Sequence, residues 1–334
     1  MENWCNMDNT VKYISDDYEI AMAARRAHVP PIHAVPGEGR ICLPAVERHA
    51  GMTSPSVVLI TGASTGIGYA TTLLLRARGY RVFGASRNPI QAGASGIDMV
   101  ALDVTSDESV TTGVKTVLER AGRIDILINN VGYVLLGSAE ETSLTELTAQ
   151  LDTNFLGAVR VTRAVLPRLR AQRHGKIINI SSLGGLAALP YSSAYAASKF
   201  ALEGYSEALR HELRSFGVYV SLVEPSNVRT ETLATSIRRS AAAHPAYAAT
   251  RERIIADFIA AGHRSTFEPG AVARVVARIV EHPAPRLRYP IGLQARFVPL
   301  LKALLPQAIF ETILRRQLHL DATRAVAHRM GQGG

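Results

Sequence analysis

Short apolar runs alternate with helical stretches through the middle of the chain. Runs suited to buried strands cover residues 57–60, 80–85, 99–102, 126–129, 176–180 and 219–223. Between them, apolar residues recur at helical spacing over about 67–78, 108–122, 144–172 and 194–216, and Ser143 and Glu146 form a capping-box pattern before the third helix. Strands that alternate with helices are typical of crossover units with parallel strands. The pattern therefore predicts a single-domain α/β fold with a doubly wound parallel sheet.

The first strand runs into a glycine-rich turn. Residues 61–68 read Thr-Gly-Ala-Ser-Thr-Gly-Ile-Gly, and a helix is expected to begin within them. Gly62 permits a sharp reversal, Gly66 lets the backbone approach a phosphate, and Gly68 permits close packing of helix on strand. A helix start directs backbone N–H groups and a favourable dipole at a pyrophosphate. The turn therefore predicts a dinucleotide site in a Rossmann-like fold.

The end of the second strand bears on the choice of cofactor. Residues 84–88 read Gly-Ala-Ser-Arg-Asn, without the acid that would accept hydrogen bonds from a ribose 2′-OH. Arg87 suits a 2′-phosphate, because a guanidinium binds phosphate with two parallel hydrogen bonds. We therefore expect NADP(H) to be favoured over NAD(H). The alternative interpretation is that Arg87 is a solvated surface residue.

Candidate acid–base chemistry lies in the last predicted helix and before it. Tyr195 and Lys199 are four residues apart and share one helix face, so the ammonium can favour the ionised phenol. The strand at 176–180 leads to Ser181 and Ser182, either of which could hydrogen-bond a substrate oxygen. No Gly-x-Ser-x-Gly elbow surrounds them, which argues against a hydrolase.

In this combination and order the motifs resemble the short-chain dehydrogenase/reductase family, over about residues 57–232. The resemblance implies a catalytic set of Asn154, Ser182, Tyr195 and Lys199, in which Ser182 matches the family's spacing to the tyrosine and Asn154 helps to hold a proton-relay water. It also implies a set of cofactor contacts: Gly62, Ser64, Thr65, Gly66, Ile67, Gly68, Arg87, Asp103, Val104, Asn130, Gly132, Tyr195, Lys199, Pro225, Val228 and Thr230. Val131 replaces the family's usual alanine, and Ser226 replaces its usual glycine.

Composition excludes several other classes. The 334 residues are 47% hydrophobic, enough for a full α/β core, and the net charge of +9 comes from arginines scattered among alanines. We therefore expect no nucleic-acid partner. Cys5 and Cys42 both precede the first strand and the histidines lack ligand spacing, so no metal site is expected. No apolar run approaches a membrane span and no signal-peptide pattern begins the chain, which predicts a cytoplasmic protein without a stable membrane anchor.

The chain ends extend beyond this unit. Residues 1–53 lack a sustained period, and we expect a poorly ordered extension before a catalytic domain at 54–285. Residues 286–334 are expected to form a helical extension that borders and covers the substrate site. Its apolar stripe comprises Phe297, Leu300, Leu301, Leu304 and Leu305. The alternatives for this stripe are ordinary core packing and reversible contact with a membrane surface.

The predicted function is an NADP(H)-dependent oxidoreductase that interconverts a carbonyl and a secondary alcohol, with Tyr195 as acid and base. Residues 200–210 and the long C-terminal region are similar to the branch containing estradiol 17-beta-dehydrogenase and retinol dehydrogenases, which implies an apolar, steroid, retinoid or lipid-like substrate. The resemblance also implies a homo-oligomer. The alternatives are a ketoacyl-thioester reductase and a non-catalytic cofactor-sensing protein.

Overall fold

The computed structural model describes residues 55–89, 97–229, 236–318 and 320. The chain divides into two units, Met1–Met52 and Thr53–Gly334, and the described residues all belong to the second. The extension predicted at 1–53 and the cofactor contact predicted at Thr230 therefore lie outside the described residues.

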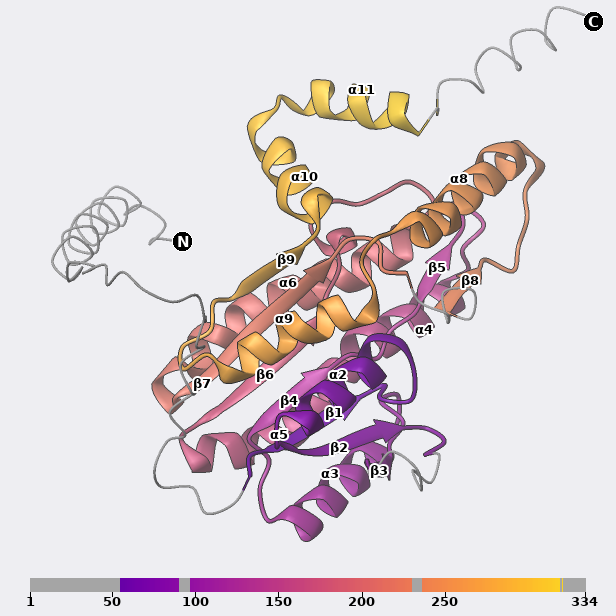
Figure 1. Cartoon of the computed structure of the whole chain (residues 1–334). Helices are drawn as coiled ribbons and strands as arrows, with labels where there is room; N and C mark the ends of the chain where they lie inside the picture. Colours follow the sequence, from indigo (N-terminus) through magenta and orange to yellow (C-terminus); the bar gives the residue numbers. More distant parts are fainter. Residues whose placement is uncertain (1–54, 90–96, 230–235, 319, 321–334) are drawn as a thin grey trace, which may run out of the picture. The chain divides into compact units, whose positions relative to one another are not determined.

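A seven-stranded parallel sheet forms the centre of this second unit (Figure 1). Its strand order is β3 (Asp98–Ala101), β2 (Arg81–Ser86), β1 (Val57–Thr61), β4 (Ile126–Asn129), β6 (Gly175–Ile180), β7 (Val218–Pro225) and β9 (Arg288–Ile291). The chain runs outward from β1 to β3 and then crosses back to β4 on the other side. Such a reversal opens a crevice at the carboxyl ends of β1 and β4, where ligands bind in sheets of this kind. The predicted doubly wound Rossmann-like fold is confirmed.

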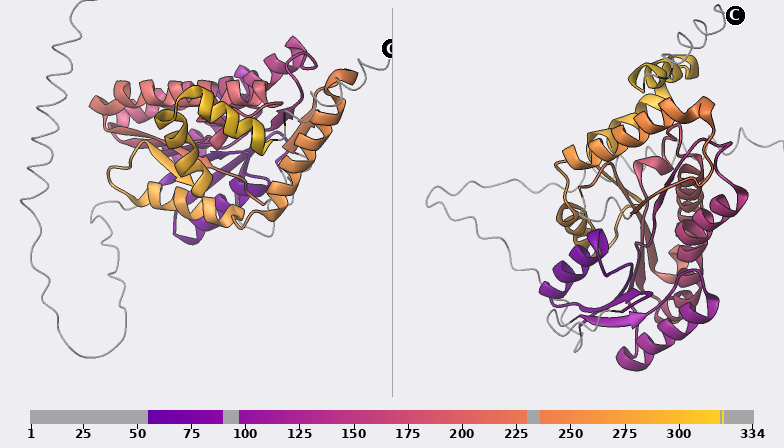
Figure 2. Two further views of the ribbon diagram at one scale, coloured as in Figure 1. Left: turned by 90° about the horizontal axis from the view of Figure 1, so that it is seen from above. Right: turned by 90° about the vertical axis from the view of Figure 1, so that its right-hand side faces the viewer.

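Helices cover both faces of the sheet (Figure 2). One face packs against α2 (Gly66–Ala77) and α9 (Pro269–Glu281), and the other packs against α3 (Asp107–Ala121), α5 (Gly157–Gln172) and α6 (Ser193–Leu213). Along β1, Val57 and Leu59 join one apolar cluster while Val58 and Ile60 join the other. Because both faces are buried, the strands are continuous apolar runs.

The helix predicted at 144–172 is interrupted by a wider turn. It consists of α4 (Leu144–Leu151), a π-helical turn η1 (Asp152–Leu156) and then α5. The predicted capping box is present, because Ser143 N donates to Glu146 Oε2 (2.9 Å) and Glu146 N donates to Ser143 Oγ (3.2 Å). π-helical turns inside helices are often found at functional sites, and this one carries Asn154.

The remaining elements lie at the carboxyl edge of the sheet or lead away from it. Strand β5 (Val134–Leu136) pairs with β8 (Ile237–Arg239), and α8 (Pro245–Arg264) follows. Short 3₁₀ turns η2 (Leu183–Gly185) and η3 (Arg214–Phe216) flank α6, and α10 (Leu293–Leu304) and α11 (Gln307–Gln317) follow β9. None of the helices in these described ranges has the length and apolarity needed to cross a membrane.

Candidate active site

The glycine-rich turn after β1 has the backbone geometry that the sequence indicates. Gly62 and Gly66 adopt positive φ values of 67° and 55°, and Gly62 N donates to Ala85 O at 2.9 Å. A Cβ added to Gly68 would lie 2.1 Å from the carbonyl oxygen of Gly62. Ser64 and Thr65 are exposed at the start of α2, where free N–H groups and the helix dipole favour a phosphate. The glycine-rich turn and the start of α2, together called the cradle, therefore fit a dinucleotide pyrophosphate.

Asn130 holds this turn in place. Its Nδ2 donates to the carbonyl oxygens of Thr61 and Gly62, each at 3.1 Å, and its backbone N donates to Thr61 Oγ1 at 3.0 Å. The sequence predicts that the Asn130 side chain contacts a cofactor. In the structure its Nδ2 mainly holds the backbone of the glycine-rich turn, which would itself contact the cofactor. Asn130 still lines the cavity described below, beside Ile67.

The ends of β2 and β3 lie beside the glycine-rich turn. The Ser86 hydroxyl is buried and has no hydrogen-bond partner among the described residues, and Arg87 beside it is exposed. Asp103 Oδ1 accepts from Thr105 N (3.0 Å) and Thr105 Oγ1 (2.8 Å). The backbone hydrogen bond from Thr105 is the main cause that lowers the Asp103 pKa, and Arg87 lowers it further. Val104 is buried against Gly157.

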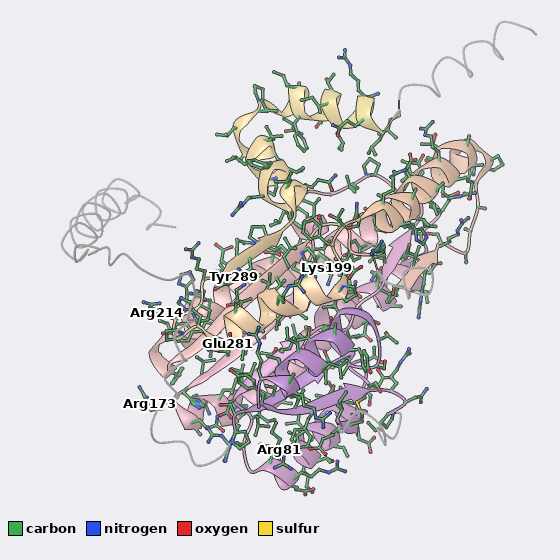
Figure 3. All side chains as sticks on the ribbon, viewed as in Figure 1. Arg81, Arg173, Lys199, Arg214, Glu281 and Tyr289 are labelled. Carbon is green, nitrogen blue, oxygen red and sulfur yellow. The ribbon has the colours of Figure 1, made fainter. Side chains whose placement is uncertain are left out.

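Lys199 lies inside the fold, unlike the peripheral Arg81, Arg173 and Arg214 (Figure 3). Its Nζ donates to Ile180 O at 2.8 Å. Burial lowers the pKa of Lys199 to about 8, against an opposing effect of Glu203. The ammonium is therefore held at the carboxyl end of β6, facing the crevice.

Asn154 and Lys199 both lie beside Gly132. A Cβ at this glycine would lie 3.3 Å from Asn154 Oδ1 and 3.6 Å from Lys199 Nζ. Asn154 Nδ2 donates to Tyr133 O (2.9 Å) and to Ser198 Oγ (3.2 Å), and its Oδ1 accepts from Tyr133 N (3.0 Å). The π-turn thus clamps the segment before β5 as well as placing an amide near the lysine.

Ser182 and Tyr195 lie close together on the wall of a cavity. The Ser182 hydroxyl accepts from Gly184 N at 3.1 Å, and a Cβ at Gly184 would lie 3.6 Å from Ser182 Oγ and 2.9 Å from Tyr195 Cε1. Burial raises the pKa of Tyr195, and the nearby Ser182 hydroxyl only partly offsets this effect. The expected lowering of this pKa by Lys199 is therefore not what the structure shows. Ser181 is buried beside Glu203, whereas Ser182 is the serine that lies beside the tyrosine.

These groups open into a cavity of about 220 Å³. Ser182, Tyr195 and Lys199 lie on its wall with Gly132, Pro225 and Val228. The rest of the wall includes a mostly apolar set: Tyr133, Val134, Leu183, Leu189, Ile237 and Phe258. The fold therefore places three of the four predicted catalytic residues, Ser182, Tyr195 and Lys199, on the wall of a mostly apolar cavity.

The part of this wall that α8 forms was not predicted from the sequence. Phe258 and Gly262 come from α8, whose Ile254 and Ile255 are buried. The signal that could have found it is the apolar spacing of Ile254, Ile255 and Phe258 after a proline at a helix start. Among the described residues, α10 contributes nothing to the cavity wall.

The apolar stripe predicted at 297–305 is not core. Phe297, Leu300, Leu301 and Leu304 are 47–71% exposed. The helix does reach the loop beside the cavity, because Lys302 Nζ donates to Leu186 O at 3.2 Å. The core-packing alternative for this stripe is therefore wrong.

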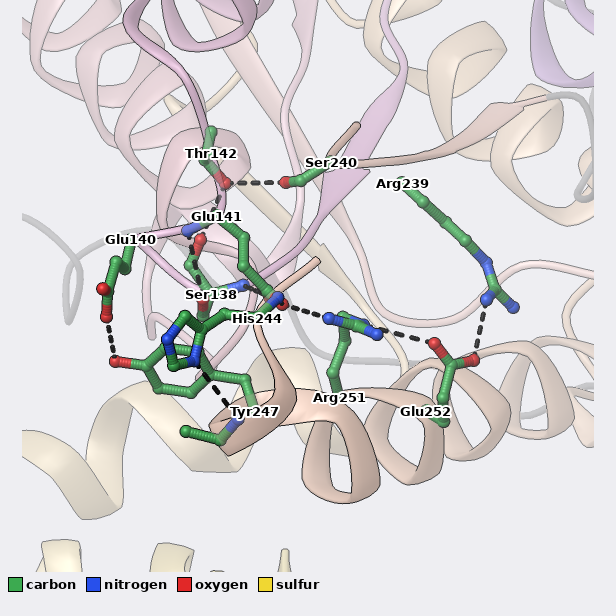
Figure 4. Close-up of polar contacts among 11 residues, drawn as sticks. Ser138, Glu140, Glu141, Thr142, Arg239, Ser240, His244, Tyr247, Arg251 and Glu252 are labelled. Carbon is green, nitrogen blue, oxygen red and sulfur yellow. Dashed lines mark hydrogen bonds and ion pairs between the residues drawn. The ribbon is translucent and has the colours of Figure 1, made fainter. Parts of the chain in front are cut away.

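A polar network fixes α8 to the segment after β5 (Figure 4). Glu141 is 2% exposed, its Oε1 accepts from His244 N (2.8 Å) and from Arg251, and its Oε2 accepts from Ser138 N (3.2 Å). Burial acts to raise the Glu141 pKa, but the hydrogen bonds and Arg251 hold it below its usual value. Tyr247 Oη also donates to Glu140 Oε2 at 2.7 Å. Side chains from both segments thus fix one wall of the cavity.

Comparison with known proteins identifies the family. The family model for short chain dehydrogenases matches residues 56–241, more than half of the chain. This protein belongs to the short-chain dehydrogenase/reductase family, whose members are oxidoreductases that act on CH–OH groups.

Two curated relatives match most of the chain. It is 38% identical over 264 residues to a 3-ketodihydrosphingosine reductase of Bacteroides thetaiotaomicron, covering 78% of this chain and 97% of the relative. It is 35% identical over 275 residues to retinol dehydrogenase 8 of Bos taurus, covering 76% of this chain and 86% of the relative.

Solved structures agree with the fold. A short-chain dehydrogenase from Streptomyces avermitilis matches with a TM-score of 0.67 and 31% identity, over 84% of this chain and 97% of its own. A metagenomic short-chain oxidoreductase in complex with NADP matches with a TM-score of 0.56 and 28% identity, over 72% of this chain and 99% of its own. A nicotinamide cofactor is therefore supported for this chain.

Proposed function

We propose that this protein is an NADP(H)-dependent oxidoreductase that interconverts a carbonyl and a secondary alcohol on an apolar, steroid, retinoid or lipid-like substrate. The observation that carries the proposal is that Ser182, Tyr195 and Lys199 line one mostly apolar cavity, with Ser182 close to Tyr195. A protein that only sensed a cofactor would not need this proton-transfer pair.

Each polar group has a role that its position supports. The nicotinamide supplies or accepts the hydride when it is bound. Ser182 would hydrogen-bond the substrate oxygen and stabilise the charge that develops on it. Tyr195 would donate its proton to that oxygen in reduction and accept it in oxidation. A raised Tyr195 pKa keeps the phenol protonated, which suits the acid role. Lys199 would hydrogen-bond the nicotinamide ribose.

The acid–base role is tested by Tyr195→Phe, which removes the proton and keeps the ring. Turnover should fall by at least about a hundredfold, while NADPH affinity stays within a few-fold. Tyr205→Phe is the matched control, because Tyr205 lies on the same helix and packs edge-on against Phe155. Near-normal turnover in Tyr195→Phe would reject the proposed chemistry.

The preference for NADP(H) rests on the end of β2. Arg87 is exposed beside the unpartnered Ser86 hydroxyl, and residues 84–88 include no acid that would repel a 2′-phosphate. Arg87→Asp should weaken NADPH binding about tenfold or more, because a charge-assisted hydrogen bond contributes about 1.5–3 kcal/mol. Arg76→Asp, near the far end of α2, is the control. Tighter binding of NADH than NADPH by the unchanged protein would contradict the assignment.

The apolar substrate class is supported by the mostly apolar cavity wall and by the activities for which the two relatives are named. The test follows NADPH absorbance with a panel of ketones: a steroid, a retinoid, a long-chain ketosphingoid base, a small polar ketone and a ketoacyl thioester. The apolar ketones should have the higher kcat/KM. Preference for the small polar ketone or for the thioester would overturn the substrate class.

A homo-oligomer is part of the same proposal. Sedimentation of the purified protein at several concentrations measures it directly. A monomer at every concentration would reject it.

A further inference from the structure

Two helices near the C-terminal end of the described chain carry an uncovered apolar face. Ala295 is the sole buried residue of α10, and no residue of α11 is buried. Of the thirteen large apolar residues exposed in the described ranges, these two helices hold seven: Leu293, Phe297, Leu300, Leu301, Leu304, Ile309 and Ile313. Their spacing of three or four residues places them in stripes along each helix.

Such helices need a surface to cover them. A helix of eleven or twelve residues is marginal in water and gains its stability from burial of an apolar face. An exposed apolar patch of several contiguous side chains marks an interaction site. The charges on the two helices indicate which kind of surface covers this face.

The charges beside the stripe favour an anionic lipid surface. Arg296, Lys302, Arg315 and Arg316 lie on these helices with one acid, Glu311, for a formal net charge of +3, of which the Lys302 ammonium is turned to the protein and the arginines supply the rest. Aliphatic residues accompanied by arginine and lysine are typical of helices that lie in the interface of a bilayer. The cores of protein interfaces are instead enriched in aromatic residues, and Phe297 is the single aromatic member of the seven exposed residues.

The two helices are also joined to both sides of the cavity. Because β9 runs parallel to β7, α10 begins at the carboxyl edge of the sheet, where the active site lies (Figure 1). Lys302 Nζ donates to Leu186 O in the loop that supplies Leu183 and Leu189 to the wall. At the other end, Arg253 on α8 donates to Leu318 O at 3.2 Å.

We propose that α10 and α11 form a reversible docking surface for an anionic lipid bilayer. Docking there would hold the cavity walls close to the phase in which an apolar substrate dissolves. This benefit for the substrate rests on the proposed function, whereas the docking itself does not.

The test is co-sedimentation of the full chain with vesicles of phosphatidylcholine, with and without phosphatidylglycerol. The unchanged protein should pellet with the anionic vesicles, and added salt should release it. Leu304→Glu should weaken this binding about tenfold or more, because it places a charge at the apolar contact. Leu144→Glu is the matched control, since Leu144 is similarly exposed but lies on α4.

Charge reversals test the electrostatic part. Glu311→Lys should strengthen binding to the anionic vesicles, and Arg316→Glu should weaken it. Absence of binding at low salt, or equal binding by Leu304→Glu and Leu144→Glu, would overturn the proposal. Absence of vesicle binding together with a smaller assembly for Leu304→Glu in sedimentation would also overturn it, and would assign the face to a second copy of the chain.

A separate assay distinguishes failure of the docking from failure of the proposed function. NADPH oxidation is measured with an apolar ketone dispersed in detergent, where no bilayer is present. Absence of turnover there, with vesicle binding intact, would reject the function and leave the docking standing. Turnover in detergent without vesicle binding would reject the docking and leave the proposed function standing.

Discussion

The glycine-rich turn, where the proposed cofactor would bind, is shaped mainly by backbone atoms, whereas the α8 wall, where the proposed substrate would bind, is held by side chains; we call these the cofactor end and the substrate end. At the cofactor end, a Cβ at Gly68 would lie 2.1 Å from the carbonyl oxygen of Gly62, so a single added carbon has no space there. At the substrate end, α8 depends on hydrogen bonds and ion pairs to Glu141. A backbone cradle suits a cofactor shared across a family, while a wall held by side chains can change with the substrate. The two ends should therefore respond differently to substitution.

The largest effect is expected at the cofactor end, from Gly68→Ala. The new Cβ would lie 2.1 Å from a backbone oxygen that cannot move without shifting the turn. We expect a loss of at least about 3 kcal/mol in the free energy of unfolding, together with loss of NADPH binding. Chemical denaturation and fluorescence titration measure the two. Normal NADPH binding would show that the cradle is less rigid than its geometry indicates.

Lys199 lies where the two ends meet, and its burial predicts a pH dependence. Its pKa falls from an ordinary 10.5 to about 8, so below pH 8 the folded protein bears the full cost of a buried charge. As pH rises from 8 to 10.5 the folded state loses its proton first, and that cost disappears. Relative to Lys199→Met, the unchanged protein should gain up to about 3 kcal/mol of stability across this range. Denaturation of both proteins between pH 7 and 10 measures it, and parallel curves would contradict the burial.

Glu141→Gln should loosen the substrate end without affecting the cofactor end. The substitution removes the charge that Arg251 and the His244 backbone share, at a cost of about 2 kcal/mol in the free energy of unfolding. KM for an apolar ketone should rise while NADPH affinity stays unchanged. Glu281→Gln is the control, because Glu281 pairs with Arg78 near the surface and has no part in the Arg251 network. An equal change in KM for both variants would show that Glu141 does not position the wall.

The smallest effect is expected from Gly204→Ala, on the helix that carries Tyr195 and Lys199. A Cβ at Gly204 would meet no atom within 4 Å. Alanine in a helix interior should therefore stabilise the protein by about 0.5–1 kcal/mol, and leave NADPH binding unchanged. Thermal denaturation measures this gain, and a loss of stability would show that tight packing is not confined to the cradle.

Local chemistry made the cofactor end predictable. Gly62, Gly66 and Gly68 follow a buried strand directly, so the turn and the helix start can be recognised from neighbouring residues. The same holds for the capping box at Ser143 and for the order of strands and helices. Tyr195 and Lys199 are one helical turn apart, and their shared face follows from helix geometry.

The substrate end depended on contacts between distant segments. Phe258 reaches the cavity because Arg251 and His244 join α8 to Glu141, which is more than a hundred residues earlier. The direction of the Tyr195 pKa also required the fold, since burial outweighs what helical spacing to Lys199 suggests. The stripe at Phe297 to Leu304 has the periodicity of core, yet the fold leaves it exposed. The sequence by itself determined the elements and motifs that arise from neighbouring residues. Burial and the partners of each side chain were decided only by the tertiary structure, because they depend on which distant segments pack together.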